Sequence, residues 1–361
     1  MVKINQKILN GYFKNKKVLI TGHTGFKGSW LSLILIKLNA KVYGISNTKP
    51  KKNNIYNLTK KKLIKDYNED ILNFQKLKKI IFKIKPDIIF HLAAQSLVIK
   101  SYKEPKDTFL VNSIGSLNIL ETVRLLNIKI NIIMITSDKA YLNVEKKSGY
   151  VENDKLGGKD PYSASKASAE HVIEAYANSY FINNKKIKIV TARAGNVIGG
   201  GDWSDNRIVP DAIRSWKSKK VLNVRNPHST RPWQHVLDPL FGYLLLAFKL
   251  NTKKSLNNEK FNFGPNTKKN YSVEELLKSL DKSLEGFKWT SKQRYKLYEA
   301  NLLKLNCNKA KKLLQWEPKL NFDQTTKYTT DWYKSYYSGN KNNCLKTSEL
   351  QIENYIEMIN K

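Results

Sequence analysis

Five side chains suited to acid–base chemistry follow one another in a single stretch of the sequence. They are Ser137, Asp138 and Lys139, directly after an apolar strand pattern at 132–136, and Tyr162 and Lys166, at the start of the next helical pattern. Tyr162 and Lys166 are one helical turn apart and share a face, where a positive charge lowers the pKa of a phenol from about 10. A tyrosine tuned in this way takes a proton from an alcohol while hydride leaves the same carbon. The pattern predicts dehydrogenase chemistry, which requires a cofactor.

Each half of this stretch also has a purely structural interpretation. Asp138 and Lys139 could form a salt bridge on a solvated loop, and Tyr162 could belong to an ordinary amphipathic helix that starts after Pro161. The position of Asp138 and Lys139 favours a functional role, because an open α/β sheet presents side chains to a ligand at the carboxyl ends of its buried strands.

A strand, a glycine-rich turn and a helix come first among the elements that must position these groups. The apolar strand at 17–20 runs into TGHTGFKG, and an apolar helical pattern follows. Gly22 suits a tight turn, Gly25 lets the backbone approach a pyrophosphate at the helix N-terminus, and Gly28 allows close packing of helix on strand. This predicts a dinucleotide site of the Rossmann type. Its candidate contacts are Gly22, His23, Thr24, Gly25, Phe26, Lys27 and Gly28.

Later segments are expected to complete the dinucleotide site. The strand at 41–46 should end in an acid for the adenosine ribose, but Asn47, Thr48 and Lys49 follow it, which leaves NAD and NADP both open. Asp70 and Ile71 form an acid-plus-apolar pair suited to an adenine edge, or Asp70 caps the next helix. The other candidate contacts are Thr48, Leu92, Ala93, Ala94, Gln95 and Asn112, the last of which is more typical of a polar bridge.

Strands and helices alternate up to about residue 194, which is typical of a doubly wound parallel α/β sheet of the Rossmann type. A long glycine-rich loop and mixed short elements follow. We therefore expect a dinucleotide-binding domain at 1–195 and a smaller C-terminal α/β substrate lobe at 196–335, which returns strands such as 260–265 to the main sheet. A linker and a terminal helix are expected at 336–361.

The composition excludes several classes of partner. The chain has 361 residues, with 64 Lys and Arg against 30 Asp and Glu and a formal net charge of +34. Most of the excess is lysine scattered through every segment, without a basic stripe interleaved with aromatics, so no nucleic-acid partner is expected. The two distant cysteines, Cys307 and Cys344, indicate neither a disulfide framework nor a metal site. Without an apolar run long enough for a membrane or a signal-peptide core, the expected location is the cytoplasm.

The chain resembles the extended short-chain dehydrogenase/reductase family in five motifs, which are TGHTGFKG, HLAAQ, TSDKAY, YSASK and RAGNVIGGGDW, in this order. Within that family it is most similar to the branch of 4,6-dehydratases that acts on CDP-glucose, in TGHTGFKGSWL, GGKDPYSASK, GNVIGGGDW and RNPHSTRPWQHVLDPL. The resemblance covers nearly the whole chain. It implies NAD as the cofactor, CDP-glucose as the substrate, and a 4-keto-6-deoxy sugar and water as the products, in deoxysugar synthesis for surface polysaccharides.

The resemblance also implies a role for each candidate. Tyr162, helped by Lys166 and the hydroxyl of Ser137, would deprotonate the sugar's 4-hydroxyl as hydride passes to NAD. Asp138 would protonate the departing 6-hydroxyl. Lys139 would take the carbon-5 proton, which needs a neutral amine, or would stabilise the enolate by its charge. Candidates for binding the nucleotide sugar are Ser96, Asn196, Trp203, Arg207, Arg231, Trp233 and His235, of which the tryptophans and the histidine could equally be packing residues.

Two other functions remain open on the same scaffold. A sugar-nucleotide 4-epimerase or decarboxylase would use Tyr162 and Lys166 but does not need an acid/base pair after Ser137. A non-catalytic dinucleotide binder would typically lose the tyrosine or the lysine, and both are present. The resemblance further implies a homodimer or tetramer, in which helices at about 107–126 and 161–180 of two copies pair into a four-helix bundle.

Overall fold

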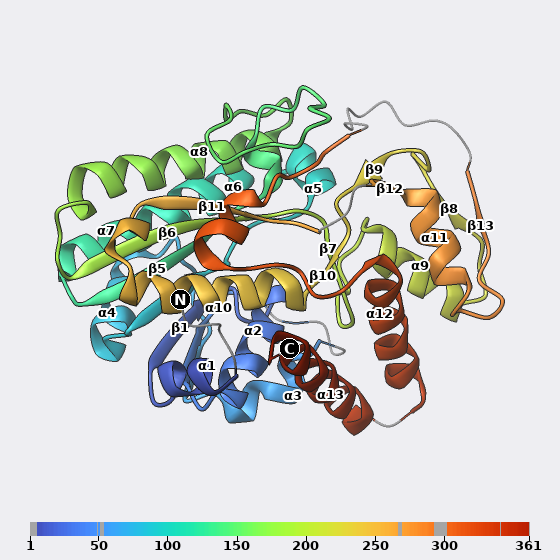
Figure 1. The fold of residues 1–361 in the computed structure, drawn as a ribbon, viewed down its shortest axis with the longest axis horizontal. Helices are drawn as coiled ribbons and strands as arrows, with labels where there is room; N and C mark the ends of the chain where they lie inside the picture. The colour runs from blue at the N-terminus through green and yellow to red at the C-terminus, as the bar shows by residue number, and fades with distance from the viewer. Residues whose placement is uncertain are drawn as a thin grey trace.

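A seven-stranded parallel sheet forms the centre of the molecule, in a computed structural model that describes residues 6–48, 50, 54–265, 269–291, 302–339 and 341–360 (Figure 1). Lys49, one of the residues that left NADP open, lies outside the described residues. The strand order is β11–β6–β5–β4–β1–β2–β3. The strands are β1 (Lys17–Thr21), β2 (Lys41–Ile45), β3 (Lys65–Tyr67), β4 (Ile88–His91), β5 (Ile130–Ile135), β6 (Ile187–Ala194) and β11 (Glu259–Phe263).

The chain winds outward in two directions from the centre of this sheet. It passes from β1 to β2 and β3 on one side, and from β4 to β5 and β6 on the other. The neighbours β1 and β4 therefore mark the point where the winding reverses, and a ligand crevice is expected beyond their carboxyl ends. The doubly wound parallel sheet predicted from the sequence is confirmed.

Two helical layers cover the sheet, because alternate strand residues face opposite sides. In β5, Ile133 and Ile135 belong to one hydrophobic core, and Ile132 and Met134 belong to the other. The first layer contains α1 (Gln6–Phe13), α2 (Phe26–Lys37) and α10 (Leu237–Thr252), with α13 (Lys341–Asn360) packed on α1. The second contains α4 (Phe74–Ile84), α7 (Gly115–Leu126) and α8 (Pro161–Tyr176).

Short helices connect the sheet to these layers. They are α3 (Tyr56–Thr59), α5 (Val98–Lys103) and α6 (Pro105–Phe109), with single π-helical turns at Leu110–Ile114 and Ala177–Phe181 that continue α6 and α8. The π turn after α6 leads directly into α7, so the long helix predicted after residue 101 forms as a bent succession of three pieces.

The smaller lobe lies at the right of Figure 1. Its elements are β7 (Val197–Ile198), α9 (Ile208–Lys217), β8 (Leu222–Asn223), β9 (Thr230–Arg231), β10 (Gln234–His235), β12 (Tyr271–Ser272), α11 (Val273–Asp281), β13 (Trp289–Thr290) and α12 (Phe322–Tyr337). The sheet face under α10 and the interior of this lobe share one continuous hydrophobic core.

The C-terminal segment differs from its prediction as a polar linker before a short helix. Helix α12 continues to Tyr337, and α13 spans the twenty residues from Lys341 to Asn360. The two helices pack together, and the indole of Trp332 donates to Ser348 Oγ at 2.8 Å. A polar sequence forms helix here because most of its apolar side chains, such as the buried Tyr355 and Ile352, face the same core, while Leu350 is exposed.

Candidate active site

A cavity of about 1140 Å³ opens along the carboxyl ends of the central strands and extends to the smaller lobe. Its volume exceeds that of a typical pocket for one drug-sized ligand, so a dinucleotide and a nucleotide sugar fit together. Most residues predicted from the sequence line it. They are Gly22, Thr24, Gly25, Phe26, Lys27, Gly28, Thr48, Asp70, Ile71, Leu92, Ala93, Ala94, Gln95, Ser96, Ser137, Asp138, Lys139, Tyr162, Lys166, Asn196, Arg207, Arg231 and Trp233.

The glycine turn fits a dinucleotide pyrophosphate. Gly22 adopts a left-handed conformation (φ +72°), and a Cβ on Gly28 would lie 2.3 Å from the Gly22 carbonyl oxygen. Gly25 precedes α2 without any side-chain cap, which leaves the first amides of the helix directed at the cavity. Such amides, together with the helix dipole, form an anion site.

Substituting Gly28 by alanine is expected to abolish dinucleotide binding, because the turn cannot close around the new methyl group. Overpacking of this kind also costs about 1–3 kcal/mol of stability. Gly11→Ala is the matched control, since no atom lies within 4 Å of a Cβ at that helical position. Calorimetric titration with NAD and thermal unfolding would measure both effects. Unchanged NAD affinity in Gly28→Ala would exclude the turn as the pyrophosphate site.

The end of the cavity that is expected to hold the adenosine carries two carboxylates. They come from the segment after β3, and not from the end of β2, where an acid was expected. Glu69 and Asp70 both line it, and Asp70 accepts hydrogen bonds from Asn47 Nδ2 at 2.6 Å and from the Leu72 amide at 2.8 Å. Glu69 pairs with Lys76 at 3.2 Å, so the carboxylate of Asp70 is the one that chiefly disfavours the 2′-phosphate of NADP. Asp70 does not cap α4, because Asn73 does so by accepting from the Lys76 amide.

Two predicted cofactor contacts lie behind the cavity wall. His23 turns away from the pyrophosphate position, with its ring against Gly44 and its Nε2 2.8 Å from Asp66 Oδ1. Asn112 binds the main chain of Gln95, accepting from its amide at 2.9 Å and donating to its carbonyl at 3.1 Å. Neither residue lines the cavity. His23 and Asn112 therefore hold the shape of the wall.

Trp203 and His235, predicted to contact the nucleotide sugar, also lie away from the cavity. The Trp203 ring packs 5.3 Å from the ring of Tyr333, and His235 lies fully buried with its ring 5.6 Å from that of Tyr328. Burial lowers the pKa of His235 to about 3, so it is neutral at physiological pH. Both side chains attach α12 to the loops of the lobe, as core residues do.

The segment after β5 brings three predicted groups together. Ser137 caps a short 3₁₀ turn at Asp138–Ala140, accepting from the Lys139 amide at 3.2 Å and donating to Asp138 Oδ1 at 3.1 Å. The turn directs Asp138 inward and leaves Lys139 half-buried at the cavity wall. A carboxyl group, a hydroxyl and a lysine side chain thus follow one another at the carboxyl end of the strand.

Asp138 is poised to hold a proton. Its side chain is buried, and its Oδ2 has no hydrogen-bond partner in the described part of the chain. Burial raises the pKa of Asp138, while Lys139, Ser137, Arg231 and Lys27 act in the opposite direction. Lys27 is half-buried at the cavity wall, and desolvation lowers its pKa to about 7. A carboxyl with a raised pKa is suited to act as a general acid.

Tyr162 and Lys166 project from the first turns of α8 into the cavity. Asp160 caps this helix by accepting from the Ser163 amide at 3.0 Å, and Pro161 occupies its first position. Burial lowers the pKa of Lys166 to about 8. Burial raises the pKa of Tyr162, whereas the hydroxyl of Ser137 and the charge of Arg207 act in the opposite direction. This corrects the lowered phenol pKa predicted from helical spacing, which contains no information about burial.

Guanidinium groups gather where the cavity meets the smaller lobe. Arg207 donates to Ser96 Oγ at 3.1 Å and pairs with Asp202 at 3.3 Å, and Arg231 is buried beside the acid Asp138. The sequence reasoning missed Arg225, which also lines the cavity. It opens the RNPHSTRPW motif that contains Arg231, so its position in that motif was an available signal. The planar guanidinium groups of these arginines can each donate two hydrogen bonds, which suits the diphosphate of a nucleotide sugar.

The described part of the chain contains neither a cluster of metal ligands nor a membrane-spanning helix. Among the described residues, no three or more His, Cys, Asp or Glu side chains come together as metal ligands would. None of the helices in the described ranges combines the length and apolarity needed to cross a bilayer.

Comparison with known proteins places this site in a family. The sequence model described as GDP-mannose 4,6 dehydratase matches residues 19–329, so the chain belongs to that family, a member of the extended short-chain dehydrogenases/reductases. The chain is 40% identical to a CDP-glucose 4,6-dehydratase of Salmonella typhimurium, over 96% of this chain and 97% of that protein. It is 26% identical to a UDP-glucose 4-epimerase of Mycoplasma genitalium, over 89% of this chain and 97% of that one.

Solved structures agree with the fold. The dTDP-glucose 4,6-dehydratase of Bacillus anthracis, in complex with NAD, superimposes with a TM-score of 0.76 at 21% identity, covering 91% of this chain and 99% of that one. The UDP-glucuronic acid 4-epimerase of Bacillus cereus, in complex with UDP-glucuronic acid and NAD, gives a TM-score of 0.77 at 25% identity, covering 89% of this chain and 100% of that one. The family and fold predicted from the sequence are both confirmed.

Proposed function

We propose that this protein is a CDP-glucose 4,6-dehydratase that converts CDP-glucose to CDP-4-keto-6-deoxyglucose and water, with NAD as its cofactor. The observation that carries the proposal is the meeting of Asp138, a buried carboxyl with a raised pKa, with Tyr162 in one cavity. A 4-epimerase needs only the tyrosine, whereas loss of water from carbon 6 needs an acid. The 40% identity to the Salmonella typhimurium enzyme over nearly the full length supports CDP-glucose as the substrate.

The glycine turn and the first amides of α2 would hold NAD, whose chemistry is to accept hydride and later return it. Tyr162 takes the proton of the sugar's 4-hydroxyl, with Ser137 hydrogen-bonded to its phenol. The resulting ketone acidifies carbon 5. Asp138 then donates its proton to the departing 6-hydroxyl, which leaves as water.

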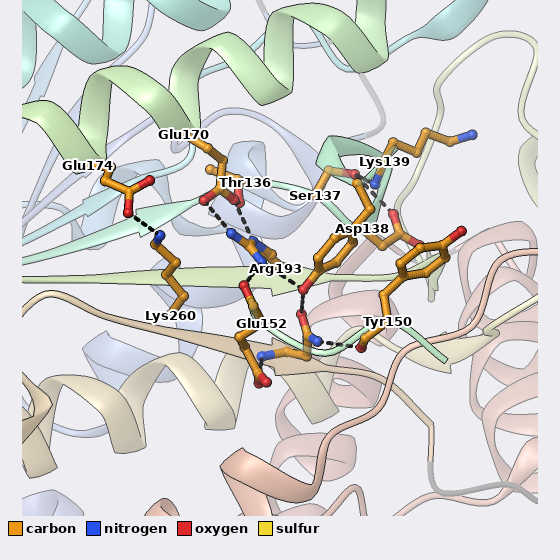
Figure 2. Close-up of polar contacts among 12 residues, drawn as sticks. Thr136, Ser137, Asp138, Lys139, Tyr150, Glu152, Glu170, Glu174, Arg193 and Lys260 are labelled. Carbon is orange, nitrogen blue, oxygen red and sulfur yellow. Dashed lines mark hydrogen bonds and ion pairs between the residues drawn. The ribbon is translucent and has the colours of Figure 1, made fainter. Parts of the chain in front are cut away.

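Lys139 stabilises the negative charge that develops on the sugar or takes the carbon-5 proton. It lines the cavity, and its charge favours the ionised form of Asp138. In Figure 2 its side chain extends away from the buried groups behind Asp138.

Turnover of a panel of nucleotide sugars would test the function. The purified protein with NAD is incubated separately with CDP-glucose, dTDP-glucose, UDP-glucose and GDP-mannose, and the products are followed by mass. Loss of one water from CDP-glucose alone, without net reduction of NAD, is the expected result. Water loss from a different nucleotide would refute the cytidine assignment. Isomerisation without a mass change would make the protein an epimerase, and no change in any sugar would remove the dehydratase proposal.

The same function implies an assembly and a location. The helical pieces at 105–126 and 161–181 expose Phe109 and Ile114 from one and Tyr180 from the other, which supports pairing of two copies through a four-helix bundle. Cys307 and Cys344 are both unpaired thiols, which supports the cytoplasm as the compartment.

A further inference from the structure

A buried ion pair lies directly behind the catalytic segment, outside the cavity lining. Arg193 of β6 and Glu170 of α8 have side chains that are 0% and 1% exposed. Two parallel contacts join them, from Nε to Oε1 at 2.8 Å and from Nη2 to Oε2 at 2.9 Å (Figure 2). Neither residue reaches the cavity. Removing two charges from water to this degree costs free energy unless their remaining polar atoms also form hydrogen bonds. Both side chains form such further contacts.

Those contacts reach both ends of the segment that carries Ser137, Asp138 and Lys139. Thr136, the residue before Ser137, donates its hydroxyl proton to Glu170 Oε1. Tyr141, the residue after the 3₁₀ turn, accepts from Arg193 Nη1 at 2.7 Å. The ion pair therefore holds the residues on either side of the turn that contains Asp138 and Lys139.

The same pair also fixes the helix that carries the proton-transfer groups. Tyr162, Lys166 and Glu170 follow at intervals of four residues, so they lie along one face of α8. The Glu170 carboxylate is close enough to Lys166 to raise the pKa of that ammonium against the effect of burial. Glu170 thus connects the face bearing Tyr162 and Lys166 to the strand end bearing Ser137.

A second layer of contacts keeps the arginine in place. Arg193 Nη1 also donates to the Glu152 carbonyl at 2.8 Å, and the Tyr141 hydroxyl donates to Asn262 Oδ1 at 2.8 Å. The Asn262 amide in turn donates to Glu152 Oε1 at 2.9 Å. These hydrogen bonds join the loop that contains Glu152 to β11, and they hold the guanidinium of Arg193 in one position.

We propose that Glu170 and Arg193 form a positioning pair for the elimination step, which sets the Ser137–Ala140 segment against Tyr162 and Lys166. This inference rests on the proposed dehydratase function. Oxidation at carbon 4 depends chiefly on Tyr162 and Lys166, which share α8 with Glu170, and Ser137 only assists it. Elimination also needs Asp138, whose position relative to α8 depends on this pair. Loosening the pair therefore slows water loss more than oxidation.

The decisive variant is Glu170→Gln, which keeps the side chain's shape and removes its charge. The matched control is Glu174→Gln, one turn along the same helix, where Glu174 pairs with Lys260 at 2.8 Å and is 42% exposed (Figure 2). In Glu170→Gln we expect kcat to fall on the order of 10²-fold, the loss expected from a displacement of about 1 Å, with little change in KM. In single-turnover measurements, reduced nicotinamide should form and persist, because water loss is the slower step. Glu174→Gln should behave as the unsubstituted protein.

A milder variant covers the case in which Glu170→Gln does not fold. Thr136→Val removes only the hydroxyl that reaches Glu170 and leaves the ion pair intact, and it should show the same excess slowing of water loss at smaller size. Equal slowing of oxidation and water loss in either variant, or an unchanged kcat in a folded Glu170→Gln, would overturn the proposal.

Amide hydrogen exchange separates this inference from the proposed function. In the protein without cofactor or substrate, the amides at 136–141 should exchange faster in Glu170→Gln than in Glu174→Gln and in the unsubstituted protein. Unchanged exchange at 136–141 would count against the positioning role even if the enzyme is a dehydratase. If no nucleotide sugar loses water, faster exchange would still establish that the pair holds the segment, while its assignment to an elimination step would fall.

Discussion

Tyr162→Phe is expected to reduce turnover of CDP-glucose by about 10²–10⁴-fold, the range for loss of a general acid–base group. The substitution removes only a hydroxyl. The ring remains in its buried position at the start of α8, so the fold and the NAD affinity should be retained. Tyr162 must be ionised to take the proton of the 4-hydroxyl; burial, which raises its pKa, opposes this ionisation, whereas Ser137 and the charge of Arg207 favour it. The hydroxyl of Tyr162 thus acts in the proton-transfer step. The effect should therefore appear in kcat.

Tyr176→Phe provides the control on the same helix. Its hydroxyl donates to Glu121 of α7 at 3.1 Å, at the opposite end of α8 from Tyr162, and its loss should leave kcat unchanged. Steady-state kinetics with NAD titration on both variants would measure the difference. A Tyr162→Phe enzyme that keeps more than about a tenth of the original kcat would show that another group accepts the 4-hydroxyl proton.

Asp138→Asn is expected to separate the two halves of the reaction. The amide cannot donate the acidic proton, so water loss should fall by about 10²–10⁴-fold. Oxidation at carbon 4 relies on Tyr162 and Lys166 and should continue. Reduced nicotinamide and the unreleased 4-keto sugar should then accumulate in a single turnover, visible by absorbance and by mass. The unpartnered Oδ2 of Asp138 makes the substitution structurally mild.

The control for this variant is Asp154→Asn, in the loop that follows the active segment. Asp154 pairs with Lys146 at 2.7 Å and does not line the cavity, so its substitution should change neither half-reaction. If Asp138→Asn loses oxidation and elimination to the same degree, then Asp138 serves both steps and the assignment of a dedicated acid would have to be withdrawn.

Local patterns predicted the parts of this protein that local geometry determines. The alternation of apolar strands and helices specifies the parallel sheet, and the glycine spacing specifies the turn at Gly22–Gly28, because both depend on residues close in the chain. The four-residue interval likewise placed Tyr162 and Lys166 on one face. Glu170 lies at the next such interval, so part of the supporting pair was visible in the sequence.

Side-chain direction and burial could not be predicted in the same way. In the chain, Trp203 lies next to a cavity-lining residue and His235 lies two residues from one, yet both face α12, which comes from a distant part of the sequence. His23 turns behind the glycine loop because Gly44 of the neighbouring strand leaves room for its ring. The direction of the Tyr162 pKa shift depends on burial, which only the assembled lobe determines.

The continuous core beneath α10 limits which parts of this fold can be replaced independently in evolution. Helix α10 and strand β11 come from the later part of the chain, yet they complete the interior beside β5 and β6. Exchange of the smaller lobe as a block between relatives would expose that shared interior to solvent, whereas exchange of the loops at its rim would not. We therefore expect the substrate preference of relatives to change through substitutions in these loops, while the sheet and the smaller lobe are inherited together.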